Sequence, residues 1–138
     1  MNIIDDGQRN GFPILLLHGL GANAESWDLQ IPALVETGYR VLAPDLPGFG
    51  KSCFNGKRWD FDWVAESIID LLRSKQIENI GLLGISMGGV LGLKLAAEYP
   101  AFVKMSILVN SFAALRPKGW NEFIYFARRG LRAFFLSP

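Results

Sequence analysis

A serine set among glycines is the first candidate for chemistry in this sequence. Ser86 lies in the run Gly84-Ile85-Ser86-Met87-Gly88, which has the G-x-S-x-G spacing of a nucleophile elbow between an apolar segment and a helix-forming segment. A strand that turns sharply into a helix strains its corner residue, and glycines at 84 and 88 allow the two elements to approach closely. The motif predicts that the Ser86 hydroxyl is exposed at the carboxyl ends of the strands. The alternative is a glycine-rich turn with a solvent-exposed serine.

Two backbone N–H groups could stabilise the negative charge that develops on the oxygen of a carbonyl group when Ser86 attacks its carbon. Met87 begins the predicted helix, so its N–H and the positive end of the helix dipole face that position. The loop His18-Gly19-Leu20-Gly21 follows another predicted strand, and the N–H of Leu20 is the natural second donor. Leu20 and Met87 are therefore predicted to form an oxyanion hole.

His18, the only histidine of the chain, has two interpretations. It could be the general base for Ser86, since a base must lie within hydrogen-bond reach of its nucleophile. Its position at the entrance of the glycine-rich loop favours the other interpretation, in which the imidazole fixes the loop by hydrogen bonding. We assign His18 and Gly19 a structural role at the site.

Short apolar runs alternate with longer amphipathic stretches, and Gly, Pro, Asn and Asp mark the joins. Strands are predicted at 2–5, 14–17, 40–43, 80–84 and 105–109, and helices at 27–37, 60–75 and 87–98. The strands are apolar without alternation, as expected when helices cover both faces of a sheet. The pattern predicts a three-layer α/β fold with a mostly parallel sheet of four or five strands.

Four segments together resemble the α/β-hydrolase fold superfamily and occur in its order. They are LLLHGLGANAESW (15–27), VLAPDLPGFGKS (41–52), IGLLGISMGGVLGLKLAAEYP (80–100) and SILVNSFAALRP (106–117). The resemblance implies a serine esterase-like hydrolase that cleaves an ester, thioester or C–C bond through an acyl-enzyme, or transfers the acyl group. Relatives that open epoxides or displace halide carry Asp where this chain has Ser86. The resemblance gives Asp45 a structural role, although a solvated turn is also possible.

The resemblance also indicates what is missing, because the family's order is Ser, then Asp or Glu, then His. No Asp and no His follow Ser86. Asn110 occupies the position that some relatives use for the acid, and neither Glu98 nor Glu122 suits that role. We therefore expect residues 1–117 to form the N-terminal part of an incomplete α/β-hydrolase core that is inactive alone. The alternative is a non-catalytic binding or scaffold protein with this fold.

Residues 118–138 have a different character, with many aromatic residues and three nearby arginines, Arg128, Arg129 and Arg132. We interpret this segment as the first helices of a lid over an apolar substrate pocket. A membrane-surface amphipathic helix is the alternative. Gly130 interrupts the apolar face and the polar face is small, which favours the lid.

The composition excludes several classes of function. The 14 basic and 13 acidic residues leave no excess of positive charge that would indicate nucleic-acid binding. With 50% hydrophobic residues, the chain is too apolar to be disordered. Cys53, the only cysteine, gives neither an internal disulfide nor a metal cluster, so no metal or other cofactor is expected. The acidic N-terminus does not resemble a signal peptide, and the apolar run 13–17 is too short to span a bilayer. These features predict a cytoplasmic protein with a small apolar ester-type substrate. An uncovered sheet edge would make the chain prone to association.

Overall fold

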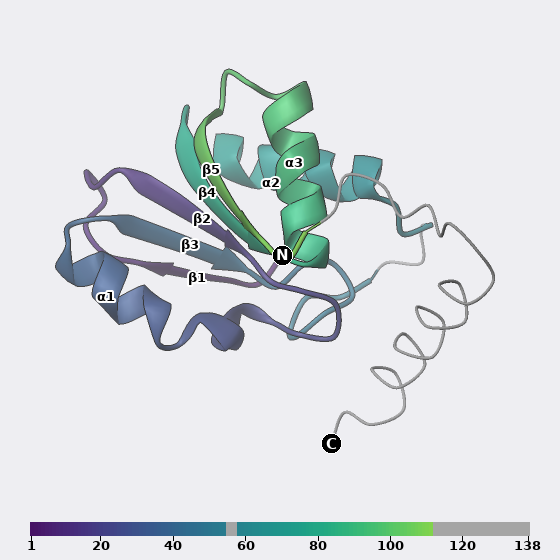
Figure 1. Cartoon of the computed structure of the whole chain (residues 1–138), viewed down its shortest axis with the longest axis horizontal. Coiled ribbons are helices and arrows are strands. Elements are labelled where there is room, and N and C mark those ends of the chain that lie inside the picture. The colour runs from purple at the N-terminus through teal and green to yellow at the C-terminus, as the bar shows by residue number, and fades with distance from the viewer. Residues whose placement is uncertain (55–57, 112–138) are drawn as a thin grey trace.

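A mostly parallel sheet of five strands organises the chain, as the sequence predicts (Figure 1). The computed structural model describes residues 1–54 and 58–111, so the predicted segment 118–138 lies outside the described residues. The strands are β1 (Ile3–Asp6), β2 (Pro13–Leu17), β3 (Arg40–Pro44), β4 (Ile80–Ile85) and β5 (Val103–Val109). Their order in the sheet is β1-β3-β2-β4-β5, with β1 antiparallel to β3 and the other neighbours parallel.

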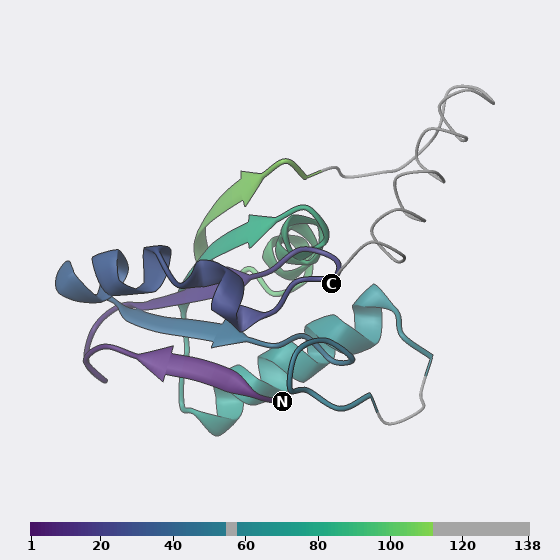
Figure 2. The same cartoon turned by 90° about the horizontal axis from the view of Figure 1, so that it is seen from below.

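Helices cover both faces of this sheet and create two apolar cores. On one face lie the 3-10 turn η1 (Ala24–Trp27) and α1 (Gln30–Glu36); on the other lie α2 (Phe61–Ser74) and α3 (Met87–Glu98) (Figures 1 and 2). Neighbouring residues of β2 serve different cores, because successive side chains of a strand point to opposite faces. Leu15 and Leu17 pack in the core that α2 and α3 cover, and Leu16 packs with Trp27 and Ile31. The layered α/β prediction is therefore confirmed.

Helix α2 follows from its sequence in a direct way. The Asp60 carboxylate accepts a hydrogen bond from the Trp63 N–H at 2.9 Å, which caps the helix at its predicted start. The buried residues of α2 recur at spacings of three and four and are Val64, Ala65, Ile68, Ile69 and Leu72. This apolar stripe attaches the helix to the sheet.

The predicted helix 27–37 differs from the structure, which divides it into η1 and α1. Asn23 caps η1 by accepting a hydrogen bond from the Glu25 N–H at 2.9 Å, so the helical geometry begins earlier than predicted. Pro32 has no N–H and cannot donate to the carbonyl four residues before it, which excludes a continuous helix from Trp27. Within α1 the same proline occupies the first turn, where an N–H has no partner in the helix in any case.

One part of the sheet carries exposed apolar side chains. Met105, Ile107 and Val109 of the edge strand β5 are 55%, 57% and 43% exposed. Ile107 pairs with Leu83, which packs in the core on the α1 side, so these side chains are on that face of the sheet. Within the described residues, α1 covers this face only over the strands nearer β1. No described helix has the length and apolar character that a membrane span requires.

Candidate functional site

Ser86 lies at a strand-to-helix corner, directly after β4 and directly before α3. Its φ is 52° and its ψ is −117°, a conformation that a residue with a side chain adopts only when its surroundings impose it. The Ser86 N–H donates to the carbonyl oxygen of Val109 at 3.0 Å, and its own carbonyl accepts from the Val90 N–H at 3.0 Å. The corner is thereby fixed to both β5 and α3, at the carboxyl end of β4.

Two glycines make this corner possible by removing the side chains that would separate α3 from the sheet. A Cβ on Gly88 would lie 2.1 Å from the carbonyl oxygen of Leu17. A Cβ on Gly84 would lie 2.5 Å from the carbonyl oxygen of Gly88. Both distances are far below van der Waals contact, so the backbones of α3, β2 and β4 touch directly. The structure thus brings Gly84, Ser86 and Gly88 together as the motif predicts.

The loop after β2 lies beside the corner. A Cβ on Gly19 would be 3.6 Å from the Cβ of Ser86, which places this loop in contact distance of the serine. The Gly19 carbonyl accepts from the Ala22 N–H at 3.2 Å, and this turn leaves Leu20 at its exposed tip. Within the described residues, no hydrogen bond takes up the N–H of Leu20 or of Met87. Leu20 follows Gly19 and Met87 follows Ser86 in the chain, and neither N–H takes part in a described hydrogen bond; their role as oxyanion donors stays a prediction.

His18 is fully buried, and both of its ring nitrogens are occupied. Nε2 accepts a hydrogen bond from the Leu46 N–H at 3.0 Å, and Nδ1 lies 2.8 Å from the carbonyl oxygen of Gly19. Since a carbonyl can only accept, Nδ1 carries the proton and the imidazole is neutral. Burial lowers the pKa of His18, and the Gly19 hydrogen bond and the Asp45 charge offset this only in part. The imidazole links the Gly19 loop to the loop after β3, and the ring edge also contacts Phe49.

Asp45, at the end of β3, is a buried carboxylate that three parts of the chain surround. It accepts hydrogen bonds from the Ala24 N–H at 2.8 Å, the Lys51 N–H at 2.7 Å and Asn2 Nδ2 at 2.8 Å. Burial alone would raise the pKa of this carboxyl, but the hydrogen bonds hold it below its usual range. A Cβ on Gly50 would lie within 2.6 Å of the Asp45 carboxylate, so this loop closes tightly around the charge. The Asp45 carboxylate is therefore far more enclosed than it would be in a solvated turn, the alternative interpretation of this residue.

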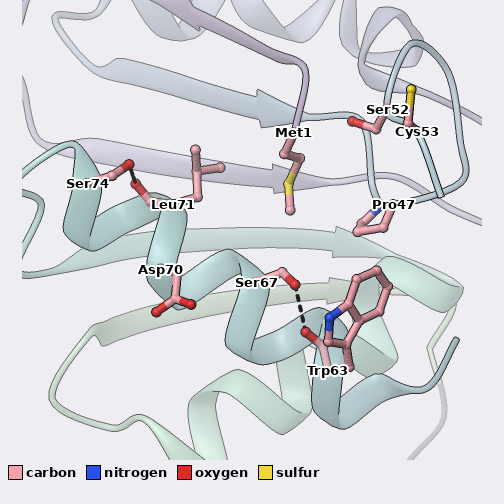
Figure 3. Close-up of a pocket in the computed structure, with 9 residues that line it drawn as sticks. All are labelled: Met1, Pro47, Ser52, Cys53, Trp63, Ser67, Asp70, Leu71 and Ser74. Carbon is pink, nitrogen blue, oxygen red and sulfur yellow. Dashed lines mark hydrogen bonds between the residues drawn. The ribbon is translucent and has the colours of Figure 1, made fainter. Parts of the chain in front are cut away.

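Away from Ser86, an open groove of about 390 Å³ lies between the start of the chain, the loop after β3 and α2 (Figure 3). Met1, Pro47 and Trp63 contribute apolar surface to it. The hydroxyls of Ser67 and Ser74 donate to backbone carbonyls of their own helix, at 2.8 and 2.7 Å, and so do not face the groove as free donors. Cys53 is exposed at its rim. None of the residues that line this groove belongs to the Ser86 corner.

Residues 1–54 and 58–111 contain no group of three or more His, Cys, Asp or Glu residues that could hold a metal ion. Asn110, at the end of β5, is exposed and has a left-handed φ of 49°. Ser111 after it contacts the Ser86 corner, a role that no sequence pattern indicates. A serine outside any motif gives no signal of its own.

Known proteins match this chain over most of its length. The family described as alpha/beta hydrolase fold matches residues 13–136. A haloalkane dehalogenase from Psychrobacter cryohalolentis is 39% identical over 106 residues, which cover 72% of this chain and 34% of that protein.

Two solved structures are also similar to this chain. An esterase from Exiguobacterium antarcticum has a TM-score of 0.73 and 33% identity, covering 79% of this chain and 40% of its own. The 2-hydroxy-6-oxo-6-phenylhexa-2,4-dienoate hydrolase from Rhodococcus sp. strain RHA1 has a TM-score of 0.77 and 31% identity, covering 91% and 48%. The chain thus spans less than half the length of each of these three relatives.

Proposed function

Because the chain belongs to the alpha/beta hydrolase fold family, we propose that it forms the nucleophile-bearing part of a serine hydrolase. The observation that carries the proposal is the strained corner at Ser86, with the Gly19 loop in contact distance and with no described hydrogen bond to the N–H of Leu20 or Met87. A backbone strain of this kind persists only where the surroundings maintain it, and nucleophiles are a common reason for it.

In the proposed reaction, the Ser86 hydroxyl attacks a carbonyl carbon and loses its proton to a general base. The N–H groups of Leu20 and Met87 stabilise the negative oxygen of the tetrahedral intermediate. The leaving group departs with a proton, which leaves an acyl-enzyme on Ser86 that water then hydrolyses. Esters, thioesters and C–C bonds next to a carbonyl all suit this sequence of steps.

The general base and its orienting acid come, in this proposal, from a part of the protein outside residues 1–138. His18 is the only histidine of the chain, and its nitrogens bind Leu46 and Gly19 rather than Ser86. The relatives are more than twice as long as the region they share with this chain. The exposed apolar face of β5, which no helix within residues 1–54 and 58–111 covers, is also consistent with further strands and helices that pack there.

The substrate we propose is a small molecule with an apolar acyl or alkyl group. Exposed aliphatic side chains lie at Ile85 and Val109, the last residues of β4 and β5, and at Leu20 in the loop after β2, which favours apolar groups near the scissile bond. The esterase and the dienoate hydrolase among the relatives act on carbonyl compounds by name, which agrees with a serine nucleophile. The dehalogenase is a less suitable guide, because halide displacement in this superfamily uses Asp at the position of Ser86.

A non-catalytic binding protein is the second candidate, and the occupied His18 favours it for the chain taken alone. The coding sequence after codon 138 distinguishes the two candidates. An open frame with an Asp and then a His supports the hydrolase, and a stop codon supports the binding protein. As a further part of the proposal, the single Cys53 fits a reducing, cytoplasmic compartment.

The experiment that tests the hydrolase compares the full-length protein with its Ser86→Ala variant. Turnover of p-nitrophenyl acetate and labelling by a fluorophosphonate are measured for both, with mass spectrometry to identify the labelled residue. We expect wild-type turnover and a label on Ser86, and a loss of about 10³-fold or more in the variant. The matched control is Ser74→Ala, an exposed serine on α2 whose loss should change neither readout. Turnover that survives in Ser86→Ala contradicts the proposal.

A further inference from the structure

A second serine, Ser111, joins the end of β5 to the nucleophile corner. Its Oγ donates to the carbonyl oxygen of Val109 at 3.0 Å, and the carbonyl oxygen of Ser86 lies 3.4 Å from the same Oγ. The Val109 carbonyl also accepts from the Ser86 N–H at 3.0 Å. One carbonyl oxygen, with its two lone pairs, therefore binds both serines.

The backbone between β5 and Ser111 is bent so that this contact can form. Asn110 has a φ of 49°, a left-handed conformation that asparagine tolerates better than most residues with a side chain. This bend follows directly after Val109 and brings the Ser111 side chain to the corner. The strained residues Ser86 and Asn110 thus flank the same Val109 carbonyl group.

Helix α3 leaves space for Ser111 at Gly89. A Cβ on Gly89 would lie 1.6 Å from Ser111 Oγ and 2.6 Å from its Cβ, so any larger residue would displace the serine. Gly89 is buried in the first turn of α3, three residues after Ser86. Ser111 therefore packs between the two elements that meet at the nucleophile.

We propose that Ser111 is a positioning residue that holds Ser86 in its strained conformation. The inference rests on the proposed role of Ser86 as nucleophile. Without the Ser111 hydroxyl, the corner loses this contact and keeps the Ser86–Val109 backbone hydrogen bond, so the end of β5 is held less firmly and Ser86 Oγ shifts relative to the N–H groups of Leu20 and Met87. A displacement of about 1 Å can cost on the order of 100-fold in rate, so a partial release is measurable.

The first test is Ser111→Ala in the full-length protein, with kcat and KM for p-nitrophenyl acetate and the rate constant for inactivation by a fluorophosphonate. We expect kcat and the inactivation rate constant to fall by about tenfold, with KM changed by less than about twofold. Ser106→Ala is the matched control, because it makes the same change on the same strand at an exposed position paired with Leu82. It should leave all three quantities unchanged.

A second test uses the close contact with Gly89. Gly89→Ala should lower both the Tm and the inactivation rate constant, since the new methyl group displaces Ser111. Adding Ser111→Gly removes the clash, so the double variant should recover Tm. It should not recover the inactivation rate constant, because the double variant has no hydroxyl at position 111. If the rate constant recovers together with Tm, Ser111 acts only on stability and the inference is wrong.

Failure of this inference differs from failure of the proposed function. If wild type is labelled at Ser86 while Ser111→Ala keeps the wild-type kcat and inactivation rate constant, only the positioning role is overturned. If wild type is not labelled at Ser86, the nucleophile assignment fails and the positioning role fails with it.

Discussion

His18 and Asp45 determine, at the level of single residues, how the loops around Ser86 are held. The imidazole connects Gly19 to Leu46, and the carboxylate connects Asn2, Ala24 and Lys51. Each group is buried with its hydrogen-bonding capacity used, and removal of such a group leaves its buried partners unsatisfied. These two side chains thus stabilise the loop geometry from buried positions.

The neutral state of His18 predicts a pH-dependent stability. Because its pKa in the folded protein is lowered, the unfolded chain binds a proton first as the pH falls below the ordinary value of about 6.5. The contribution of His18 to folding is complete above that value and is lost as the pH falls toward the lowered folded pKa. Urea unfolding of the full-length protein at pH 7.5 and pH 5.0 measures this loss.

His18→Asn provides the control, because its amide can donate and accept but does not titrate. The variant should be less stable at pH 7.5 by about 1–3 kcal/mol and should lose less stability than wild type between the two pH values. Every other titrating group is present in both proteins, so the difference isolates His18. Equal losses in the two proteins would show that His18 is not buried in its neutral form.

At this scale the sequence identifies residues whose signal is local. Ser86 with its flanking glycines forms a motif within five positions, and its corner conformation could be predicted. The partners of His18 and Ser111 could not, because Leu46 and Ser86 are distant in sequence and the contacts depend on loop packing. The structural role predicted for His18 stays a proposal, and its hydrogen bonds support it.

Helix α3 shows, at the scale of elements, how glycine sets the distance between a helix and a sheet. Gly88 faces the backbone of Leu17, whereas Gly92 faces the side chain of Leu82. A backbone oxygen cannot move aside without disrupting β2, but the end of a leucine side chain can adjust. The two glycines therefore differ in how much they tolerate an added methyl group.

This difference gives a graded prediction for two alanine substitutions. Gly88→Ala should lower the free energy of unfolding by about 3 kcal/mol or more, since its Cβ would lie 2.1 Å from a carbonyl oxygen. Gly92→Ala should cost less than about 1.5 kcal/mol, because alanine's higher helix propensity offsets part of the 2.5 Å contact with Leu82. Urea denaturation of both variants is the measurement. A Gly88→Ala protein as stable as Gly92→Ala would contradict the packing described here.

The elements themselves were largely predictable, because buried parallel strands are apolar runs and helix starts carry caps. The exception was the segment before α1, where Asn23 and Pro32 impose a 3-10 turn and a later helix start. The periodicity of apolar residues reveals neither the Asn23 cap nor the effect of Pro32 on the helix start. Capping and proline chemistry decide the helix boundary locally.

At the scale of the whole molecule, the apolar face of β5 predicts association when residues 1–138 are produced alone. Met105, Ile107 and Val109 form an exposed apolar row on an edge strand, the arrangement that promotes pairing between chains. Sedimentation velocity at micromolar concentration should detect oligomers. Ile107→Lys should shift the distribution toward monomer, and Ser106→Lys on the opposite face of β5 should not. A wild-type monomer over the whole concentration range would refute the prediction.

The central place of β2 in the sheet also constrains how a nascent chain can fold. Leu15 of β2 pairs with Leu42 on one side and with Leu82 on the other, and β4 leaves the ribosome only after α2. Until then, β2 has one backbone edge without a partner, and long-range parallel pairing of this kind is slow. Gly19 follows β2 and Ser86 follows β4, so the Gly19 loop and the Ser86 corner meet in the step that completes the pairing of β2 with β4. Partly synthesised chains therefore lack the assembled Ser86 corner, and under the proposed function the serine becomes reactive only in molecules whose core has closed.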